Sequence, residues 1–389
     1  MPTVRCDAMT PASRRTPPRV AHLSVVHHVQ DPRIARREGP ALRDAGFEVH
    51  QVMPHDRDET RRGIRVHALA PAEGRCRRVI RWGTLFEKAR ALDADLYHFH
   101  DPELIPVAYL LKRWTGAPVI YDMHENYRAG RGLEGRLLRL LERFCFRWVD
   151  HVVISDASYA QVTEPSRAPT TLVANYFKPP DPPVSAEKDD APLRLVYTGV
   201  LAGTRGLFAM LDLADRIKQA GRDWQLDVAG VCYRDEDRRC AEQQMRRREL
   251  GAVVERTAWD RFVPWRALMQ RTARAHVGLA LFRDNPNAAG AILTKFYEYL
   301  HYGLPILCSD FPLWRRFVER HDCGAVVPPG DAGAAFAVLD RWAEDPARYR
   351  RLSENARAAA SQYQWPGMAR RLVRLYDQLL GTSRPPLIE

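Results

Sequence analysis

The chain has 389 residues, of which 46% are hydrophobic, and its formal net charge at pH 7 is +11. This length exceeds what one hydrophobic core normally supports, so we expect two domains. No stretch approaches the roughly 18–20 consecutive apolar residues of a membrane-spanning helix, and residues 1–18 lack the apolar run of a signal peptide.

Seven scattered cysteines form no CxxC pair, which argues against a disulfide framework and a zinc ribbon and fits a reducing cytoplasm. The excess positive charge indicates an anionic partner: nucleotide phosphates, lipid headgroups or nucleic acid. Arginines on solvated helix faces would give the same net positive charge, so the charge alone does not identify the partner. Residues 1–19 are rich in Pro, Ser, Thr and Arg, which predicts a disordered tail.

From Val20, short apolar runs alternate with helical patterns, which indicates βαβ units and a parallel sheet. Asp31-Pro32 is a good N-cap and first helical position for a helix to Arg43, with Gly46 as its C-terminal cap. Residues 20–178 are therefore predicted to form a doubly wound α/β domain. Its predicted strands are Val20–Val29, Phe47–Met53, Ile64–Leu69, Leu96–His100, Val119–Met123, His151–Ser155 and Thr171–Asn175.

Residues 179–192 hold several prolines around a charged patch and are predicted to be an exposed linker. The alternation resumes over residues 193–364, which predicts a second α/β domain. Residues 365–389 follow a break at Trp365-Pro366 and are predicted to be a terminal helix and tail. The predicted strands of the second domain are Leu193–Val200, Gln225–Ala229, Val253–Thr257, His276–Leu281, Pro305–Cys308 and Ala325–Val327.

The strongest functional signal is the segment Lys295–Pro305, which predicts a loop, a short helix, a stop at Gly303 and a strand. Backbone N–H groups around Gly290, where the helix starts, can cradle a phosphate. Glu298 lies one turn into the helix, where a carboxylate can accept two hydrogen bonds from a ribose diol. A core helix with a solvated glutamate is the alternative.

This segment resembles the donor-binding region of the GT-B glycosyltransferases of family 4, where a Lys-Phe-Tyr-Glu-Tyr-type run precedes a Gly-x-Pro strand. The resemblance implies two Rossmann-like domains facing across a cleft, with Glu298 on the ribose of the donor and Lys295 near its phosphates. Many members have a second glutamate eight positions earlier, where this chain has Gly290. Without that glutamate, the backbone groups of Ala289, Gly290 and Ala291 are expected to contact the transferred sugar.

His98-Phe99-His100-Asp101-Pro102 closes a strand of the first domain. In the family, a histidine followed by an acidic residue and proline lies beside the transferred sugar, and His100 matches it. The resemblance implies that His100, with Glu298, is catalytic and positions the donor sugar. Asp101 stands on the acceptor side and could cap the following helix. A histidine that only packs is the alternative.

Two further loops resemble acceptor-side features of the family. His124 and Glu125 directly follow a strand, which suits acceptor recognition or proton handling, although solvated loop polarity explains them equally well. The Asp-x-Arg-Ile pattern ending at Arg33 and Ile34 resembles a polysaccharide-assembly branch of the family. Arg33 at that helix start could reach phosphate or acceptor.

Residues 197–206 form the first strand–loop–helix of the second domain, with Gly199, Gly203 and Arg205. Small residues let the backbone approach phosphate, and the arginine supplies a cation with bidentate geometry. Family members usually have an arginine immediately after the first glycine, where this chain has Val200. One expected phosphate cation is therefore missing, and Lys295 can compensate for it.

Residues 130–149 space four arginines three or four positions apart beside leucines, which is typical of a basic amphipathic helix on an anionic membrane. A packed helix with a solvated cationic face explains the same spacing. Enzymes of the family often use lipid-linked acceptors. We therefore retain the prediction that the protein binds peripherally to the inner face of a membrane.

The sequence thus predicts a cytoplasmic, retaining glycosyltransferase that moves a sugar from a UDP- or GDP-type donor to a glycan or lipid-linked acceptor, in cell-surface polysaccharide or glycoconjugate synthesis. No cofactor and no metal site are predicted, because protein cations and helix termini can stabilise the leaving diphosphate. The alternatives are a nucleotide-sugar epimerase or hydrolase, a silent scaffold, and a basic nucleic-acid-binding protein. The last is disfavoured because no nucleic-acid-binding motif is found.

Overall fold

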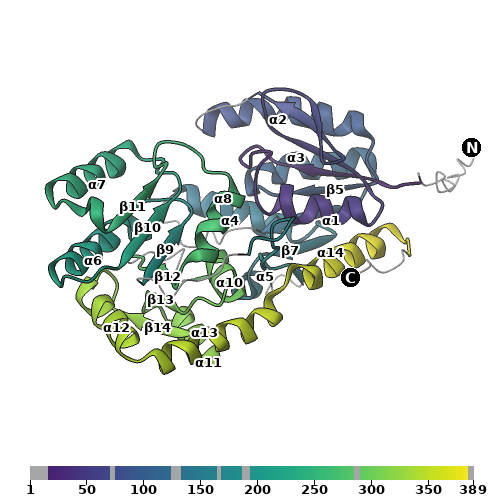
Figure 1. Cartoon of the computed structure of the whole chain (residues 1–389). Coiled ribbons are helices and arrows are strands. Elements are labelled where there is room, and N and C mark those ends of the chain that lie inside the picture. Colours follow the sequence, from purple (N-terminus) through teal and green to yellow (C-terminus); the bar gives the residue numbers. More distant parts are fainter. Residues whose placement is uncertain are drawn as a thin grey trace, which may run out of the picture. The chain divides into compact units, whose positions relative to one another are not determined.

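In the computed structural model, the described residues are 16–70, 75–123, 133–163, 168–185, 193–283 and 290–383. The chain divides into two compact units: residues 1–175 with 365–389, and residues 176–364 (Figure 1). Most of the predicted tail, residues 1–15, lies outside the described part of the chain.

The first unit contains an eight-stranded sheet in the order β3-β4-β2-β1-β5-β6-β7-β8, in which only β3 is antiparallel to its neighbour among the described pairs. The central strands are almost wholly buried because helices pack against them, which accounts for their continuous apolar runs. The strands are β1 (Arg19–Leu23), β2 (Glu48–Pro54), β3 (Glu59–Arg61), β4 (Ile64–Leu69), β5 (Leu96–Phe99), β6 (Val119–Met123), β7 (His151–Ile154) and β8 (Thr170–Leu172).

The carboxyl-terminal helix α14 belongs to this first unit, where it contacts α1 and η1. The helices of the unit are η1 (Ile34–Glu38), α1 (Gly39–Asp44), α2 (Arg75–Leu92), η2 (Pro102–Leu104), α3 (Ile105–Thr115), α4 (Leu133–Cys145), η4 (Ala157–Tyr159), α5 (Ala160–Thr163) and α14 (Trp365–Leu380).

The second unit contains a six-stranded sheet in the order β11-β10-β9-β12-β13-β14, with every described pair parallel. Its strands are β9 (Arg194–Thr198), β10 (Gln225–Ala229), β11 (Val254–Thr257), β12 (Val277–Ala280), β13 (Ile306–Ser309) and β14 (Gly324–Val327). Its helices are η6 (Gly203–Arg205), α6 (Leu207–Gln219), α7 (Asp235–Arg247), η7 (Leu250–Ala252), α8 (Trp265–Arg274), α10 (Thr294–His301), α11 (Pro312–His321), α12 (Ala332–Glu344), α13 (Pro346–Ala360) and η8 (Ser361–Tyr363).

Helix α10 packs directly on the sheet of the second unit because β12 has a glycine beneath it. A Cβ atom at Gly278 would lie 2.3 Å from the ring of Tyr299, so only glycine allows this approach. The Tyr299 hydroxyl donates to the carbonyl of Leu279 at 2.9 Å and lies 3.3 Å from that of Val196. These contacts fix the helix over β9 and β12.

The predicted strands are found with most ends shifted by at most three residues, but β1 ends at Leu23, six residues before the predicted end at Val29. The short polar strand β3 was not predicted, and the predicted start of one helix is wrong. The helix expected from Pro32 begins at Ile34, and its first turn is a π-helix in which the Glu38 N–H donates to the carbonyl of Arg33 at 2.9 Å. Asp31 still supports this start, since its carboxylate accepts from the N–H groups of Arg33 and Ile34.

None of the helices in the described part of the chain combines the length and the apolar character needed to cross a membrane.

Candidate functional site

The strand order of the second unit reverses between β9 and β12, which pair with each other while their other neighbours lie on opposite sides. In open parallel sheets, ligands bind outside the carboxyl ends of strands at such a reversal. The loops that follow β9 and β12 meet at this edge: a Cβ atom on Gly206, whose φ is 84°, would lie 2.0 Å from the carbonyl oxygen of Leu281. Glycine is therefore required at position 206.

Lys295 on α10 reaches the end of β9 from beneath this edge. Its side chain is buried, with Nζ donating to the carbonyl of Thr198 at 3.2 Å and lying 4.4 Å from the ring centre of Tyr197. A Cβ atom on Gly199 would lie 3.6 Å from Nζ, so the predicted Gly199 and Lys295 meet here. Burial lowers the pKa of Lys295 to about 8; the Glu298 carboxylate opposes this shift, and Arg205 adds to it.

Glu298 lies one turn after Lys295 on α10 and is 9% exposed. Arg205 ends η6 and is exposed, yet lies close enough to act on the pKa of both Lys295 and Tyr197. Two cations and one carboxylate therefore gather beside the glycine loop. This combination suits a diphosphate with an adjoining ribose.

The remaining residues predicted to bind the donor do not all lie beside this group. The N–H of Gly203 donates to a carboxylate oxygen of Asp237 at 3.0 Å, so it is engaged within the unit. Gly290 is exposed in a turn before α10, and the Ala291 carbonyl accepts from the Trp314 indole N–H at 2.9 Å. Ala289 lies outside the described residues.

In the first unit, His100 lies at the end of β5 and is buried. Its Nδ1 lies 3.2 Å from Oδ2 of Asp122, and its Nε2 lies 2.8 Å from Nδ1 of His22. Both ring nitrogens therefore face partners inside the unit. A direct contact between His100 and a sugar would require the ring to turn, and this role stays a prediction.

Asp101 does not cap the following helix, which corrects the capping prediction. Its Oδ2 instead accepts from the N–H groups of Val25 and Val26 and from the hydroxyl of Ser24. Asp101 thus shapes the loop after β1 instead. Its place on the acceptor side stays a prediction.

Arg33 was predicted to reach phosphate or acceptor, but the structure buries it inside the first unit. Its guanidinium forms a bidentate pair with Asp122, at 2.8 and 2.9 Å, and donates to the Val173 carbonyl and the side-chain oxygen of Asn175. Its Nε also lies 2.9 Å from Oε1 of Glu38. These internal partners account for Arg33, because a buried cation needs paired charge and hydrogen bonds.

His124 and Glu125, the other two predicted acceptor-side residues, lie outside the described part of the chain.

Sequence reasoning missed several side chains at the two strand edges. The ring of Tyr197 makes a cation–π contact with the ammonium group of Lys295. His27 lies 3.0 Å from Asp31 and 3.5 Å from Asp101; burial lowers its pKa, but these carboxylates outweigh burial and raise it to about 9.

Four buried residues of the first unit form a group that could hold a metal ion: His22, Glu38, His98 and His100. Burial raises the pKa of Glu38 well above its ordinary value, and burial with the neighbouring imidazoles lowers that of His98 well below. The sequence predicted no metal site, since these residues are scattered over three segments.

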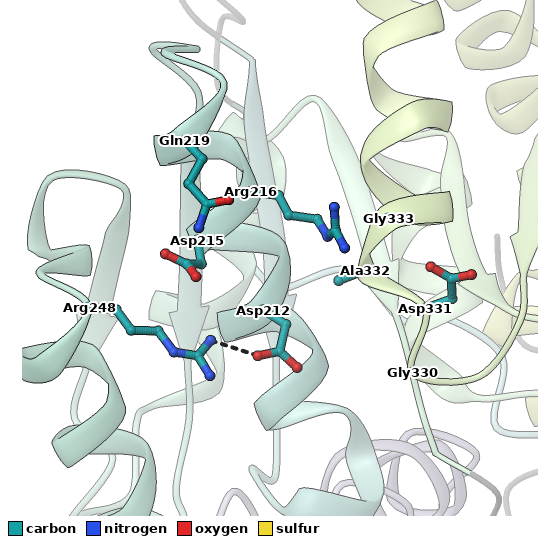
Figure 2. Close-up of a pocket in the computed structure, with 9 residues that line it drawn as sticks. All are labelled: Asp212, Asp215, Arg216, Gln219, Arg248, Gly330, Asp331, Ala332 and Gly333. Carbon is teal, nitrogen blue, oxygen red and sulfur yellow. Dashed lines mark hydrogen bonds and ion pairs between the residues drawn. The ribbon is translucent and has the colours of Figure 1, made fainter.

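An open hollow of about 620 Å³ lies elsewhere on the second unit, beside α6 and the start of α12 (Figure 2). In it, Arg248 is paired with Asp212 at 2.6 Å, and Arg216 points toward the start of α12 near Gly333. None of the predicted site residues lines this hollow, so its shape does not locate the donor site.

Two family matches together span most of the chain. Residues 32–175 match the family described as glycosyl transferase 4-like domain, and residues 181–359 match the family described as glycosyl transferases group 1. Among curated proteins, a phosphatidyl-myo-inositol mannosyltransferase of Mycobacterium leprae is 23% identical over 297 residues, which are 73% of this chain and 74% of that protein.

Solved structures share the fold over nearly the whole chain. Sucrose-phosphate synthase of Thermosynechococcus elongatus is 18% identical with a TM-score of 0.75, covering 94% of this chain and 100% of that one. The HepE protein of Anabaena, in complex with UDP-glucose, is 12% identical with a TM-score of 0.71, covering 92% and 99%. These likenesses confirm the predicted GT-B fold class.

Proposed function

Since this chain is a glycosyltransferase that belongs to the group 1 family, we propose that it transfers a sugar with retention from a UDP- or GDP-activated donor to a glycan or lipid-linked acceptor. The observation that carries the proposal is the convergence of Lys295, Glu298, Arg205 and Gly199 at the carboxyl edge of β9.

The donor is held by the second unit. Its diphosphate lies against Gly199, Lys295 and Arg205, where two cations offset the charge that develops on the leaving group. Its ribose diol donates to the carboxylate of Glu298. HepE in complex with UDP-glucose has the same fold, which supports a nucleotide sugar as the donor.

The transfer proceeds on one face of the sugar. The acceptor hydroxyl oxygen attacks the anomeric carbon on the side from which the nucleoside diphosphate leaves, and a diphosphate oxygen takes the acceptor proton. This route needs no carboxylate nucleophile, and no metal or cofactor takes part because Lys295 and Arg205 supply the positive charge. The acceptor side is formed by the first unit, with Asp101, His124 and Glu125 as predicted contributors.

A lipid-linked acceptor is supported by a basic, apolar surface on α3 and α4 of the first unit. The side chains of Leu137, Leu140 and Phe144 on α4 are exposed, and α3 adds Leu110 and Trp114, which is 69% exposed. Ring contacts between Tyr109 and Phe144 place the two helices side by side.

Arginines border this surface: Arg136, Arg143 and Arg147 are exposed. Apolar side chains rimmed by arginines suit the interface of an anionic membrane. We therefore place the enzyme on the cytoplasmic face of such a membrane, in surface polysaccharide or glycoconjugate synthesis. Replacing Leu137, Leu140 and Trp114 with serine should abolish co-sedimentation with phosphatidylglycerol vesicles; unchanged sedimentation contradicts the membrane contact.

The donor is identified by measuring the melting temperature with UDP-, GDP- and dTDP-sugars, because a ligand that binds only the folded state raises it. We expect a UDP- or GDP-sugar to raise the melting temperature, and no shift with any of them contradicts the proposal. Product analysis then separates transfer from the alternatives, since an epimerase or hydrolase consumes the donor without an acceptor.

A further inference from the structure

A group of buried side chains at the centre of the first unit points inward to one spot. His22 lies on β1, Glu38 ends η1, and His98 and His100 lie on and just after β5. One nitrogen or oxygen atom from each residue lies within 4.8 Å of the corresponding atom of every other. All four residues are at most 2% exposed.

The fold creates this arrangement from adjacent strands. β1 and β5 pair in parallel with His22 opposite His98, and His100 follows two positions later on the same face. The π-helical turn brings Glu38 to the same place. The rings of the three histidines lie with centres 4.7 to 5.1 Å apart.

Several inward-facing atoms lack hydrogen-bond partners among the described residues. These are Nε2 of His98 and both carboxylate oxygens of Glu38. Arg33 Nε lies 2.9 Å from one of those oxygens, but it donates to Asp122. Buried polar atoms are nearly always satisfied in native proteins, so Nε2 of His98 indicates a missing partner, whereas a protonated Glu38 is hydrogen-bonded to Asp122.

The outward-facing ring nitrogens, in contrast, have partners of the kind that orient metal-binding histidines. Nδ1 of His98 lies 2.7 Å from the Tyr376 hydroxyl, and Nε2 of His22 lies 3.4 Å from it. Nδ1 of His100 lies 3.2 Å from Oδ2 of Asp122. Each ring is therefore held from behind, with its other nitrogen turned to the shared spot.

The four side chains offer the nitrogen and oxygen donors that a transition-metal ion prefers. Arg33 and Asp122 form a bidentate pair beside them. Burial raises the pKa of Glu38 well above its ordinary value, so a bound ion would displace a proton from this carboxyl group, while the three imidazoles are neutral when they act as ligands. Three imidazoles with one carboxylate form a donor set that suits zinc, with tetrahedral geometry.

We propose that His22, Glu38, His98 and His100 bind one divalent transition-metal ion of the zinc type in an enclosed, structural site. Four protein ligands fill a tetrahedral shell and leave no position for substrate, so the ion takes no part in transfer, and His100 would be a metal ligand instead of the predicted contact of the donor sugar. Nδ1 of His22 and Nε2 of His100, now 2.8 Å apart, would separate to about 3.3 Å around it. The ion would join β1, β5 and η1, with Tyr376 tying α14 to them.

The test is the metal content of the full chain, purified without a metal-binding tag, loaded with zinc and dialysed against metal-free buffer. Mass spectrometry of the elements should find one zinc per chain in the wild type and none in His98→Gln or Glu38→Gln. The matched control is His67→Gln, which breaks a half-buried histidine pair of the same sheet, 2.8 Å apart, and should retain zinc.

A second measurement keeps the test decisive if the variants do not fold. Removal of zinc from the wild type with dipicolinate should lower its melting temperature, and added zinc should restore it. Substoichiometric zinc in the loaded wild type, or equal melting temperatures with and without zinc, would overturn the proposal. The unsatisfied atoms would then be explained by a proton on Glu38. Neither measurement uses a sugar donor, so their outcome is independent of the proposed transferase activity.

Discussion

Replacing Lys295 with methionine should stabilise the ligand-free protein while removing its response to nucleotide diphosphates. Lys295 is 9% exposed, and burial lowers its pKa from 10.5 to about 8. Because one pKa unit corresponds to about 1.4 kcal/mol, the charged form is disfavoured in the folded state by roughly 3 kcal/mol. Methionine is similar in length and uncharged, so it removes this cost.

The substitution also removes the contacts of the ammonium group with the Thr198 carbonyl and the Tyr197 ring. These contacts contribute roughly 1–2 kcal/mol together. The net gain in the free energy of unfolding is therefore about 1–2 kcal/mol at pH 7. For a unit the size of residues 176–364, this raises the melting temperature by about 2–6 °C.

Thermal and denaturant unfolding at several pH values provide the assay. The folded-state pKa of about 8 lies below the unfolded value of 10.5, so the wild type gains stability as the pH rises from about 8 to 10.5. Lys295→Met should lack this gain, and its advantage should shrink at high pH. The reasoning would be refuted if Lys295→Met were less stable than the wild type at pH 7. It would also be refuted if UDP and GDP raised the melting temperature of the variant as much as that of the wild type.

Three further predictions concern the two units. The donor affinity of the wild type should fall as the pH rises above about 8, because Lys295 loses its proton, and calorimetry on Lys295→Met should show no such fall. Gly206→Ala should lower the free energy of unfolding by roughly 3 kcal/mol, because the added Cβ atom would overlap the carbonyl of Leu281. Gly221 also has a positive φ but lies in open space, so Gly221→Ala should lower it by only about 1–2 kcal/mol. Equal losses of the two variants in urea unfolding would contradict this. Arg33→Lys should lose about 3–5 kcal/mol, since lysine cannot pair bidentately with the buried Asp122; a loss below about 1 kcal/mol in the same assay would show that the pair is unimportant.

The fold was largely predictable because its signals are local. Apolar runs between helical patterns gave strands such as Ile64–Leu69 and Val119–Met123 with their observed ends. Strand Glu59–Arg61 was missed because it is short, polar and half-exposed at the edge of the sheet. The π-helical turn was missed because its hydrogen bonds span five residues and leave no distinct mark in hydrophobic periodicity.

The donor half of the site was predictable for a similar reason. Lys295 and Glu298 are three positions apart on one helix, so their proximity follows from helix geometry. The Arg33–Asp122 pair joins residues 89 positions apart, and only the tertiary fold brings them together. From the sequence, Arg33 was therefore predicted to reach phosphate or acceptor, and its buried pair with Asp122 was not foreseen.

The histidine group is an intermediate case. His98 and His100 alternate on one strand, and this period-two spacing places both on one face. The contribution of His22 follows only from the pairing of β1 with β5, and that of Glu38 only from the π-helical turn. Two of the four side chains were thus accessible to sequence reasoning, while their convergence was not.

The most direct test of the central claim is the affinity of Glu298→Gln for UDP and GDP, measured by isothermal titration calorimetry. The amide replaces one carboxylate oxygen that accepts from the ribose, which should cost about 1.5–3 kcal/mol, or roughly 10- to 150-fold in Kd. Glu319→Gln, an exposed residue on α11 of the same unit, is the matched control and should bind as the wild type does. Equal affinity of Glu298→Gln and the control, or no binding of either nucleotide to the wild type, would contradict the account.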